Sequence, residues 1–275
     1  MIKKVLISTA VAGFTFAALG FNNKLKLTRY IVESPKVKRP FNMVFLSDIH
    51  SIKFKDGGRN LFETIDKAMP DCILLGGDVF HKFGDEEDFE RTYELLKNLA
   101  CKYQNCCMIT GNHEFECGKA DEIRRSVAKF GINILGDESY VLSAANDQSI
   151  LVGGTDYAGF GEDEVLLQKQ NFVRRAEESG LFSVLVRHIP MRVENDENID
   201  LILSGHNHGG LWRLPKTKIG VAGGGGKLFP KYTHGKYNFN NSCLIVGSGI
   251  TTETYLLPRL YNPPEVVSVS VVPKI

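Results

Sequence analysis

The sequence lacks several features that mark specialised classes of protein. It has no clear excess of either charge, because 33 Lys and Arg residues stand against 32 Asp and Glu residues and the formal net charge is +1. Proteins that bind nucleic acid usually carry a clear basic excess, so a polynucleotide partner is disfavoured. The 275 residues contain no repeat of fixed short period and no low-complexity domain. That length suffices for one large α/β domain or two small ones.

Cysteine pairs of the kind that bind metal are also missing. None of the six cysteines forms a CxxC pair, which disfavours a zinc ribbon or a redox dithiol. Cys72 lies in an apolar, strand-like run and is expected in the core, where free cysteine is often found. The spacing leaves disulfide bonds open among Cys101, Cys106, Cys107 and Cys117.

An apolar segment stands at the N-terminus. Lys3 and Lys4 precede an uncharged, largely apolar run over 5–21, which as a helix would span roughly 25 Å. That is slightly short of the hydrocarbon thickness of about 30 Å, but the run is longer than most signal-peptide cores. Residues 1–22 are therefore expected to form a membrane anchor or signal segment. A retained anchor, a cleaved signal and a buried helix are the three interpretations, and the first predicts a location at the cell membrane.

Basic residues lie on both sides of the apolar run, so the positive-inside rule leaves its orientation open. Residues 23–40 are polar and basic and include Pro35 and Pro40. They are expected to form a linker that is either solvated or placed against anionic lipid headgroups. Residues 41–275 are expected to form the functional domain.

Strand-like and helix-like segments alternate beyond residue 40. The expected strands include 43–46, 72–75, 106–109, 150–152, 182–186 and 201–203. The expected helices are 60–69, 86–100, 119–130 and 165–176. Successive strand–loop–helix units predict a largely parallel sheet with helical crossovers, and therefore an α/β fold.

Polar side chains follow these strands where each strand ends. They are Asp48, His50, Asp78, Asn112, His113, His188, His206 and His208. Ligands bind beyond the carboxyl ends of strands in parallel sheets, so these side chains should converge. Carboxylate, imidazole and amide oxygen are ligands that suit Zn, Mn or Fe. One shared carboxylate, Asp78, would bridge two ions about 3.5–4 Å apart, as in two-metal hydrolytic sites.

The same residues carry a family resemblance. The elements are Asp48-Ile49-His50, Gly77-Asp78, Gly111-Asn112-His113-Glu114, His188 and Gly205-His206-Asn207-His208. In this order they resemble the signature of the calcineurin-like metallophosphoesterases. Gly209-Gly210, Leu214-Pro215 and Pro263-Pro264-Glu265 are similar to a membrane-associated branch, which includes UDP-2,3-diacylglucosamine pyrophosphohydrolase-like and cell-wall-associated phosphoesterases. The resemblance implies a four-layer α/β/β/α sandwich of two mixed sheets flanked by helices.

The resemblance also implies residue roles in a metal-dependent phosphoric ester hydrolase. One divalent ion (Mn, Zn or Fe) would be held by Asp48, His50, Asp78 and His208, and a second by Asp78, Asn112, His188 and His206. A hydroxide bridging the two ions would attack phosphorus. His113 would protonate the leaving oxygen as general acid. Glu114 would either orient the His113 ring or lie on the surface as a solvated carboxylate.

Two positions depart from the family pattern. Many members have an acidic or amide residue a few positions after the bridging aspartate, where this chain has Val79-Phe80-His81. His81 is either a substrate contact or a solvent-exposed histidine. Arg187, beside His188, either binds a substrate phosphate bidentately or forms a structural ion pair. Asp156 follows a strand in a similar way but is interpreted as a turn or capping residue.

Three functions compete at this stage. A hydrolase of a lipid-linked or cell-envelope phosphate follows from the ligand set and the apolar N-terminus, and the family resemblance slightly favours the extracytoplasmic side of the membrane. The alternative is a phosphodiesterase that acts on a soluble nucleotide or another small phosphodiester. A metal-free interaction module predicts a broken ligand set, whereas every expected ligand is present.

Overall fold

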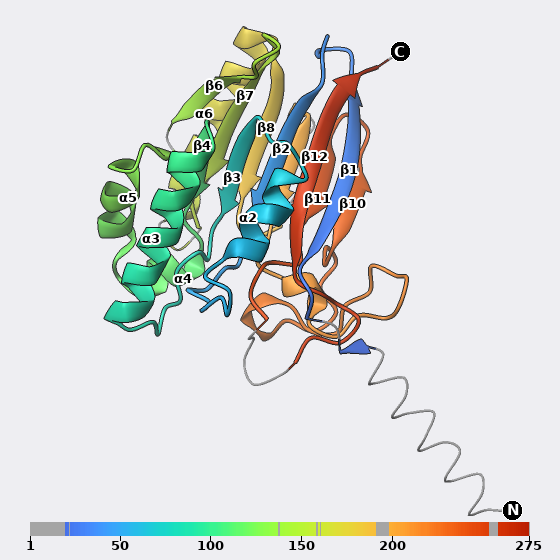
Figure 1. The fold of residues 1–275 in the computed structure, drawn as a ribbon. Coiled ribbons are helices and arrows are strands. Elements are labelled where there is room, and N and C mark those ends of the chain that lie inside the picture. Colours follow the sequence, from blue (N-terminus) through green and yellow to red (C-terminus); the bar gives the residue numbers. More distant parts are fainter. Residues whose placement is uncertain are drawn as a thin grey trace, which may run out of the picture.

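The computed structural model describes residues 20–21, 23–136, 138–157, 159, 161–190, 198–252 and 258–274. Within these ranges two six-stranded sheets stack face to face, and helices cover both outer faces (Figure 1). The predicted four-layer α/β/β/α sandwich of two mixed sheets is therefore confirmed.

The first sheet has the strand order β1-β12-β2-β3-β4-β5. Its strands are β1 (Lys26–Ser34), β2 (Phe41–Leu46), β3 (Cys72–Gly76), β4 (Cys106–Ile109), β5 (Asn133–Ile134) and β12 (Glu265–Pro273). The four strands from β2 to β5 are mutually parallel. The last strand, β12, inserts between β1 and β2 and runs antiparallel to β2. The C-terminal segment is thus built into the middle of the sheet.

The second sheet has the order β10-β11-β9-β8-β7-β6. Its strands are β6 (Ser139–Ser143), β7 (Ser149–Thr155), β8 (Phe182–Arg187), β9 (Leu201–Ser204), β10 (Gly235–Asn238) and β11 (Cys243–Val246). The four central strands, β11, β9, β8 and β7, are mutually parallel. The two edge strands, β6 and β10, are antiparallel to their neighbours. Each sheet therefore has a parallel centre that can support a site at its carboxyl edge.

Helices cover the outer faces of the sheets. Those against the first sheet are α2 (Arg59–Asp66), α3 (Glu86–Lys102) and α5 (Ala120–Ala128), and α6 (Glu162–Ser179) covers the second. Shorter elements are α4 (Asn112–Glu116), η3 (His208–Gly210) and η4 (Gly224–Gly226). A capping box between Asp85 and Asp88 starts α3. Three acidic residues in its first turn interact favourably with the positive end of the helix dipole.

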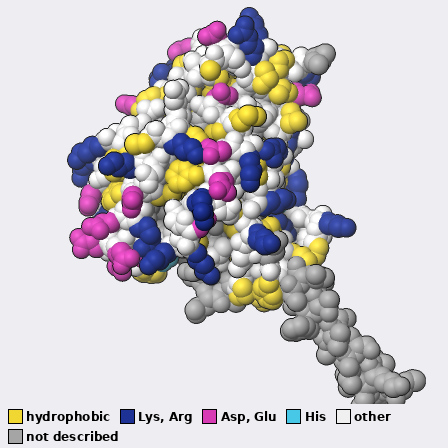
Figure 2. Space-filling model, in the orientation of Figure 1, with side chains coloured by type: hydrophobic (Ala, Val, Ile, Leu, Met, Phe, Trp, Pro, Cys, Tyr) yellow, Lys and Arg dark blue, Asp and Glu magenta, His cyan; other side chains and the backbone are white. Residues whose placement is uncertain are grey.

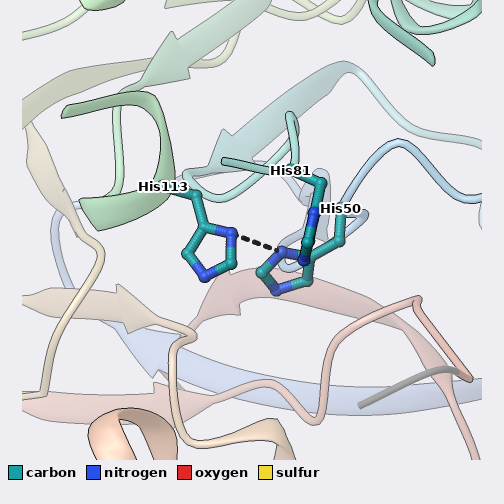
Figure 3. Close-up of side chains that lie close together, drawn as sticks. All are labelled: His50, His81 and His113. Carbon is teal, nitrogen blue, oxygen red and sulfur yellow. Dashed lines mark hydrogen bonds between the residues drawn. The ribbon is translucent and has the colours of Figure 1, made fainter. Parts of the chain in front are cut away.

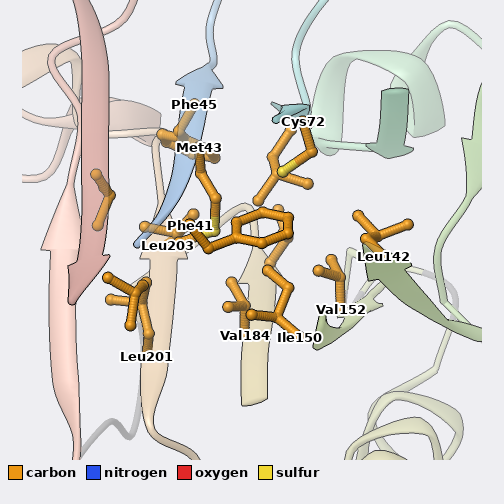
Figure 4. Packing of buried hydrophobic residues seen from close by; sticks show 14 of the residues in the cluster. Phe41, Met43, Phe45, Cys72, Leu142, Ile150, Val152, Val184, Leu201 and Leu203 are labelled. Atoms are coloured by element: carbon orange, nitrogen blue, oxygen red, sulfur yellow. The ribbon is translucent and has the colours of Figure 1, made fainter. Parts of the chain in front are cut away.

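The main core lies between the two sheets. Phe41, Met43 and Phe45 of β2 point into it, while Val44 and Leu46 point to the helices on the other side. This alternation follows from the two-residue period of a strand. Both faces of β2 are covered, which explains why its sequence is almost uniformly apolar. Figure 4 shows the β2 side chains against residues of the second sheet.

The six cysteines are free, and Cys72 is fully buried in the core as expected. Residues 23–40, expected to form a basic linker, contain strand β1. Its charged side chains, such as Arg29 and Glu33, are exposed at the sheet edge, whereas Val32 is buried. Charged residues on an edge strand discourage pairing with another chain. Half of the predicted linker is thus an edge strand of the first sheet.

The expected location at the cell membrane through a single N-terminal segment is contradicted. A spanning helix needs about 20 consecutive apolar residues. In the part of the chain that the structure describes, no helix is long and apolar enough to cross a membrane. The longest described helix, α6, has 18 residues, and many of them are charged. Most of the predicted segment 1–22 lies outside the described residues, apart from Gly20 and Phe21.

Candidate metal centre

The predicted ligands lie in loops at the carboxyl ends of five strands. In the first sheet these loops follow β2, β3 and β4, and in the second they follow β8 and β9. The loops and α4 gather at the same end of the two sheets (Figure 1). Side chains that are up to 160 residues apart in sequence therefore meet because parallel strands all end at this edge.

One group of donor atoms contains Asp48, His50, His208 and Asp78. The Nε2 atoms of His50 and His208 are 3.3 Å apart. Asp48 Oδ1 lies 3.8 Å from His208 Nε2, and Asp78 Oδ2 lies 3.9 Å from His50 Nε2. These four side chains face one another across the two sheets.

A second group contains Asp78, Asn112, His188 and His206. Asn112 Oδ1 lies 3.2 Å from His188 Nε2 and 3.1 Å from His206 Nδ1. The two imidazole nitrogens are 3.3 Å apart, and Asp78 Oδ2 lies 3.1 Å from His188 Nε2. Asp78 Oδ2 therefore belongs to both groups.

These separations fit divalent metal ions. Metal–ligand bonds of about 2.0–2.2 Å place neighbouring ligand atoms roughly 3.0–3.6 Å apart in tetrahedral or octahedral sites. Most of the distances between these donor atoms, 3.1–3.9 Å, are close to that range. The mixture of imidazole, carboxylate and amide oxygen suits Zn, Mn or Fe. The donor set and its spacing thus match what two adjacent ions require.

The backbone is strained at most of the donors. Asp48, His50, Asp78, His206 and His208 all have positive φ angles, between 46° and 69°. Such angles are uncommon for residues with a side chain and cost of order 1–3 kcal/mol each where the conformation is sparsely populated. Backbone hydrogen bonds between loops hold this arrangement, including Asp48 N to the Gly77 carbonyl at 3.1 Å. Strain that is concentrated in this way is typical of functional sites.

Close packing of backbone around Asp78 requires glycine. A Cβ on Gly111 would lie 2.3 Å from Asp78 Oδ1, and a Cβ on Gly77 would lie 2.8 Å from the Gly111 nitrogen. Gly77 also has a φ of 84°, which favours glycine. These short contact distances explain why each of the motifs Gly77-Asp78 and Gly111-Asn112 begins with glycine.

Glu114 holds the loop after β3. Its carboxylate accepts hydrogen bonds from four backbone amides, those of Asp78, Val79, Phe80 and Gly111, at 2.7–3.0 Å. Among the described residues none of its hydrogen bonds goes to the His113 ring, which was one of the two roles predicted for it. Burial raises the pKa of this carboxyl to about 7, while the donated amides favour the ionised form. Glu114 is fully buried and not on the surface.

Burial sets the charge of most imidazoles in the site. It lowers the pKa values of His50 and His206 to about 3 and that of His208 well below its usual range. Burial also raises the pKa of Asp48 to about 6. The three imidazoles are therefore neutral near pH 7, which is the form that binds metal.

His188 and Asp78 form a tighter pair. Burial lowers the pKa of His188, but the Asp78 carboxylate opposes this more strongly and raises it to about 10. The same contact holds the pKa of Asp78 below its usual range in spite of burial. His188 Nδ1 also lies 2.8 Å from the Gly76 carbonyl, to which it donates. That bond leaves Nε2 directed at Asp78 and Asn112, as in metal sites where the second ring nitrogen is fixed by an outer acceptor.

His113 lies at the edge of the donor groups. Its Nδ1 is 3.2 Å from His50 Nδ1 (Figure 3). The same Nδ1 accepts a hydrogen bond from the Lys82 backbone amide at 3.3 Å. Its Nε2 lies 4.0 Å from Asp78 Oδ2. Because Nδ1 accepts, the neutral ring carries its proton on Nε2, the nitrogen that faces the centre.

His81 joins His50 and His113 in a cluster of three imidazoles (Figure 3). Its ring centroid is 5.1 Å from that of His113, and its side chain is half-buried. The structure thus brings His81 to the rim of the site. Arg187 is half-buried at the end of β8, beside His188, and lines a cavity there. Asp156, expected to cap or turn, is buried and accepts hydrogen bonds from Thr110, Arg124 and Gln168.

Two residues that the sequence did not indicate, Asn262 and Arg259, support His208. Asn262 Nδ2 donates to the His208 carbonyl at 2.6 Å and to that of Leu211 at 3.3 Å. The Arg259 guanidinium, which is fully buried, donates to the same His208 carbonyl at 3.4 Å. Both lie just before β12, beside the Pro263-Pro264-Glu265 segment. That segment was the only sequence signal near them, and it did not indicate this contact.

Comparisons with known proteins agree with this site. A model of the calcineurin-like phosphoesterase family matches residues 41–210. The uncharacterized protein YpbG of Bacillus subtilis (strain 168) is 27% identical over 266 residues, or 94% of this chain and 93% of YpbG. Phosphodiesterase YaeI of Escherichia coli (strain K12) is 32% identical over 189 residues, or 64% of this chain and 63% of YaeI. The uncharacterized metallophosphoesterase YkuE of Bacillus subtilis (strain 168) is 24% identical over 265 residues.

The family match covers more than half of the chain and includes every donor from Asp48 to His208. Members of this family depend on divalent metal ions, and the structure contains clusters of His and Asp able to hold them. The chain therefore belongs to the calcineurin-like phosphoesterase family and is a metal-dependent phosphoesterase.

Proposed function

We propose that this protein is a phosphodiesterase with two divalent metal ions, one held by each of the two donor groups. Asp78 would be shared between the ions. The observation that carries the proposal is the convergence of seven donor residues, with spacings of 3.1–3.9 Å between neighbouring donor atoms and with Asp78 Oδ2 shared by the two groups. Bound ions of this kind lower the pKa of water and stabilise charge on phosphoryl oxygens.

The chain's own residues supply the proton for the leaving group. His113 Nε2 carries a proton and faces the centre, whereas Nδ1 is fixed by two neighbours. We propose that His113, protonated on both ring nitrogens when substrate is bound, donates its Nε2 proton to the oxygen of the departing alcohol and is left as the neutral ring. His81, on the other side of the same ring cluster, would contact the substrate at the rim.

Mn, Zn and Fe all fit the donor set. Metal content and activity should therefore be measured together. Purified protein treated with EDTA is expected to lose hydrolysis of bis-p-nitrophenyl phosphate and to regain it with one of these ions. Asp78→Asn should hold less than one ion per chain, because it removes the carboxylate that both groups share. Activity that survives both treatments would refute the proposal.

A matched control tests the position of the carboxylate. Asp200 lies at the opposite, amino end of β9, where it accepts hydrogen bonds from Ser183. Asp200→Asn is expected to keep both metal content and activity. An equal loss in the two variants would point to general destabilisation and would remove the support from Asp78→Asn.

The substrate class rests on separate observations. YaeI, which is 32% identical over 189 residues, is named a phosphodiesterase, and we extend that chemistry to this chain. On the face shown in Figure 2, Lys and Arg side chains are mixed with Asp and Glu. That mixture offers no single-sign track for a polynucleotide backbone. A small phosphodiester or phosphoanhydride is therefore the substrate that we propose.

A lipid-linked or cell-envelope phosphate and a soluble nucleotide are the two candidate forms of that substrate. A panel with a UDP-linked lipid, a nucleotide diester and bis-p-nitrophenyl phosphate, compared at fixed salt and metal, separates them. A kcat/KM at least tenfold higher for the lipid than for the nucleotide would support the first form, and the reverse would support the second.

A further inference from the structure

A cavity lies against the candidate metal centre. Its volume is about 240 Å³, and it is bounded by the ends of β7 and β8 and by the start of α6. The residues that matter for its chemistry are Tyr157, Val165, Leu166, Arg187, His188 and Ile189. His188 also belongs to the second donor group, so one residue forms part of both the cavity wall and the centre.

The cavity also approaches the helix that carries the proton donor. The Tyr157 ring, which lines it, contacts the Phe115 ring with the centroids 5.6 Å apart. Phe115 lies in α4, two residues after His113. The cavity thus lies next to the metal centre, on the side that His188 and α4 form, at the carboxyl ends of parallel strands.

The lining has a definite chemical character. Val165, Leu166 and Ile189 present aliphatic groups, and Tyr157 presents a ring. Charged side chains, among them Lys169 and Arg187, also line it. Small-molecule sites commonly combine an apolar wall with a few polar groups that orient the ligand.

The volume limits what can enter. A cavity of about 150 Å³ lined by aliphatic and aromatic side chains is large enough to bind benzene. A volume of about 240 Å³ therefore accepts a substituted aromatic ring or a short alkyl chain. A phosphate group without an apolar substituent has no apolar atoms that could fill this cavity.

We propose that this cavity, which we name the ester pocket, receives an apolar ester group of the substrate while the phosphoryl group lies at the metal centre. The inference rests on the proposed function and narrows it. The preferred substrate would be a phosphodiester or phosphoanhydride in which at least one substituent is an apolar chain or ring. An alkyl chain and the base of a nucleoside share this chemistry.

The test keeps the leaving group constant and varies the other ester group. Three substrates are compared with Mn²⁺: the p-nitrophenyl esters of methyl phosphate, n-hexyl phosphate and thymidine 5′-phosphate. Each buried methylene changes an equilibrium about fourfold, so two buried methylenes give roughly fifteenfold. Wild-type protein is expected to show a kcat/KM at least tenfold higher for the hexyl than for the methyl ester, or for the thymidine ester if the base is the natural group.

Two neighbouring leucines provide matched variants. Leu166 and Leu167 are consecutive in α6 and are 51% and 55% exposed, but only Leu166 lines the ester pocket. Leu166→Gln is expected to lower the ratio of hexyl to methyl, or of thymidine to methyl, at least threefold. Leu167→Gln should leave all three rates unchanged. Both substitutions are at exposed helix positions, so neither should prevent folding.

The outcomes separate the two proposals. No hydrolysis of any ester by metal-loaded wild-type protein would overturn the proposed function itself. Hydrolysis of all three at similar kcat/KM would leave that function standing and overturn the ester pocket. An equal loss of preference in Leu166→Gln and Leu167→Gln would also overturn it. A preference that only Leu166→Gln reduces supports the pocket, and the better ester identifies a chain or a base as its occupant.

Discussion

At the scale of single residues, Glu114 joins two of the loops that carry donors. Its two carboxylate oxygens each accept two backbone amides, so both lone-pair regions are used. Three of those amides belong to the loop after β3, which includes Asp78. The fourth belongs to Gly111, which precedes Asn112. Glu114 thereby sets the distance between donors from two different strands.

Glu114→Gln should therefore destabilise the protein. The glutamine amide group would point two N–H donors at backbone N–H groups that now donate to a carboxylate. We expect a loss of about 3 kcal/mol in the free energy of unfolding, from urea titration, since a buried bond to a charged group is worth about 1.5–3 kcal/mol. Glu116→Gln, on the same helix but partly exposed beside Lys82, should cost below about 1 kcal/mol. Equal losses in the two variants would contradict this role.

His113→Ala tests proton donation directly. We expect kcat to fall by roughly 10²–10⁴, with a larger loss for a phenyl ester than for a p-nitrophenyl ester. Phenolate is the more basic leaving group and depends more on the donated proton. The measurement is kcat for both esters in the variant and in wild type, with metal content checked in parallel. His81→Ala should keep the leaving-group dependence of wild type. Losses of the same size for both esters would argue against His113 as the acid.

At the scale of elements, the segment before β12 supports the turn of η3. Asn262 donates to the His208 and Leu211 carbonyls, although it lies more than 50 residues further along the chain. A Cβ on Gly209 would lie 2.2 Å from Asn262 Oδ1, so the turn and the segment are in close contact. The position of His208, a donor, thus depends on residues that follow the family match by about 50 positions.

Asn262→Ala should weaken metal binding without removing a ligand. Loss of an outer hydrogen-bond partner typically lowers metal affinity or activity about 10- to 100-fold. We expect the Mn²⁺ concentration for half-maximal activity to rise at least tenfold. Asn240→Ala, at an exposed position before β11, serves as the control and should leave it unchanged. An unchanged Mn²⁺ requirement in a folded Asn262→Ala protein would show that the contact is only structural.

The elements around the site could largely be predicted from sequence. Residues 72–75 and 106–109 are uniformly apolar, as expected for strands buried on both faces, and each ends in a glycine-led polar motif. Their parallel pairing then dictates that Asp78 and Asn112 meet. The strand β1 was missed because Lys26, Arg29 and Glu33 hide its alternation on an exposed edge.

Other features of the site could not be predicted. The positive φ angles of Asp48 and His206 arise from loop contacts between strands, which local sequence does not encode. The same holds for Glu114, whose four amide partners include three that lie more than 30 residues away. The support from Asn262 requires knowledge that β12 inserts beside β2.

At the scale of the whole molecule, Glu265 links the two sheets. It begins β12 and accepts from Thr28 of β1 at 2.6 Å, and it also accepts from the Ser248 amide after β11 at 2.9 Å. His234 Nδ1 lies 3.2 Å away. Burial raises the pKa of this carboxyl, but His234 and the hydrogen bonds lower it by more than burial raises it, and the resulting pKa is about 2.

This shift predicts a loss of stability in acid. The folded pKa lies below the ordinary value of 4.5, so the ionised group stabilises the fold above that pH and ceases to do so as pH falls toward 2. The difference between the ordinary and the folded pKa of Glu265 contributes about 3 kcal/mol to the free energy of unfolding at neutral pH. The advantage of wild type over Glu265→Gln should therefore shrink by about 2 kcal/mol between about pH 6.5 and about pH 3.

The measurement is urea unfolding of both proteins at each pH. Glu33→Gln provides the control, because Glu33 is an exposed glutamate on β1, the strand next to β12. Its effect on the free energy of unfolding is expected to be small at both pH values. An advantage of wild type over Glu265→Gln that stays constant with pH would contradict the assignment.

The donors around Asp78 come from both sheets, with Asp48, His50 and Asn112 on one side and His188, His206 and His208 on the other. Cations bound there would act as a clasp across the seam between the halves of the molecule. Because ions held in this way bind the folded chain and not the unfolded one, they would raise the free energy of unfolding. The temperature at which the protein unfolds should therefore rise with the concentration of the fitting metal.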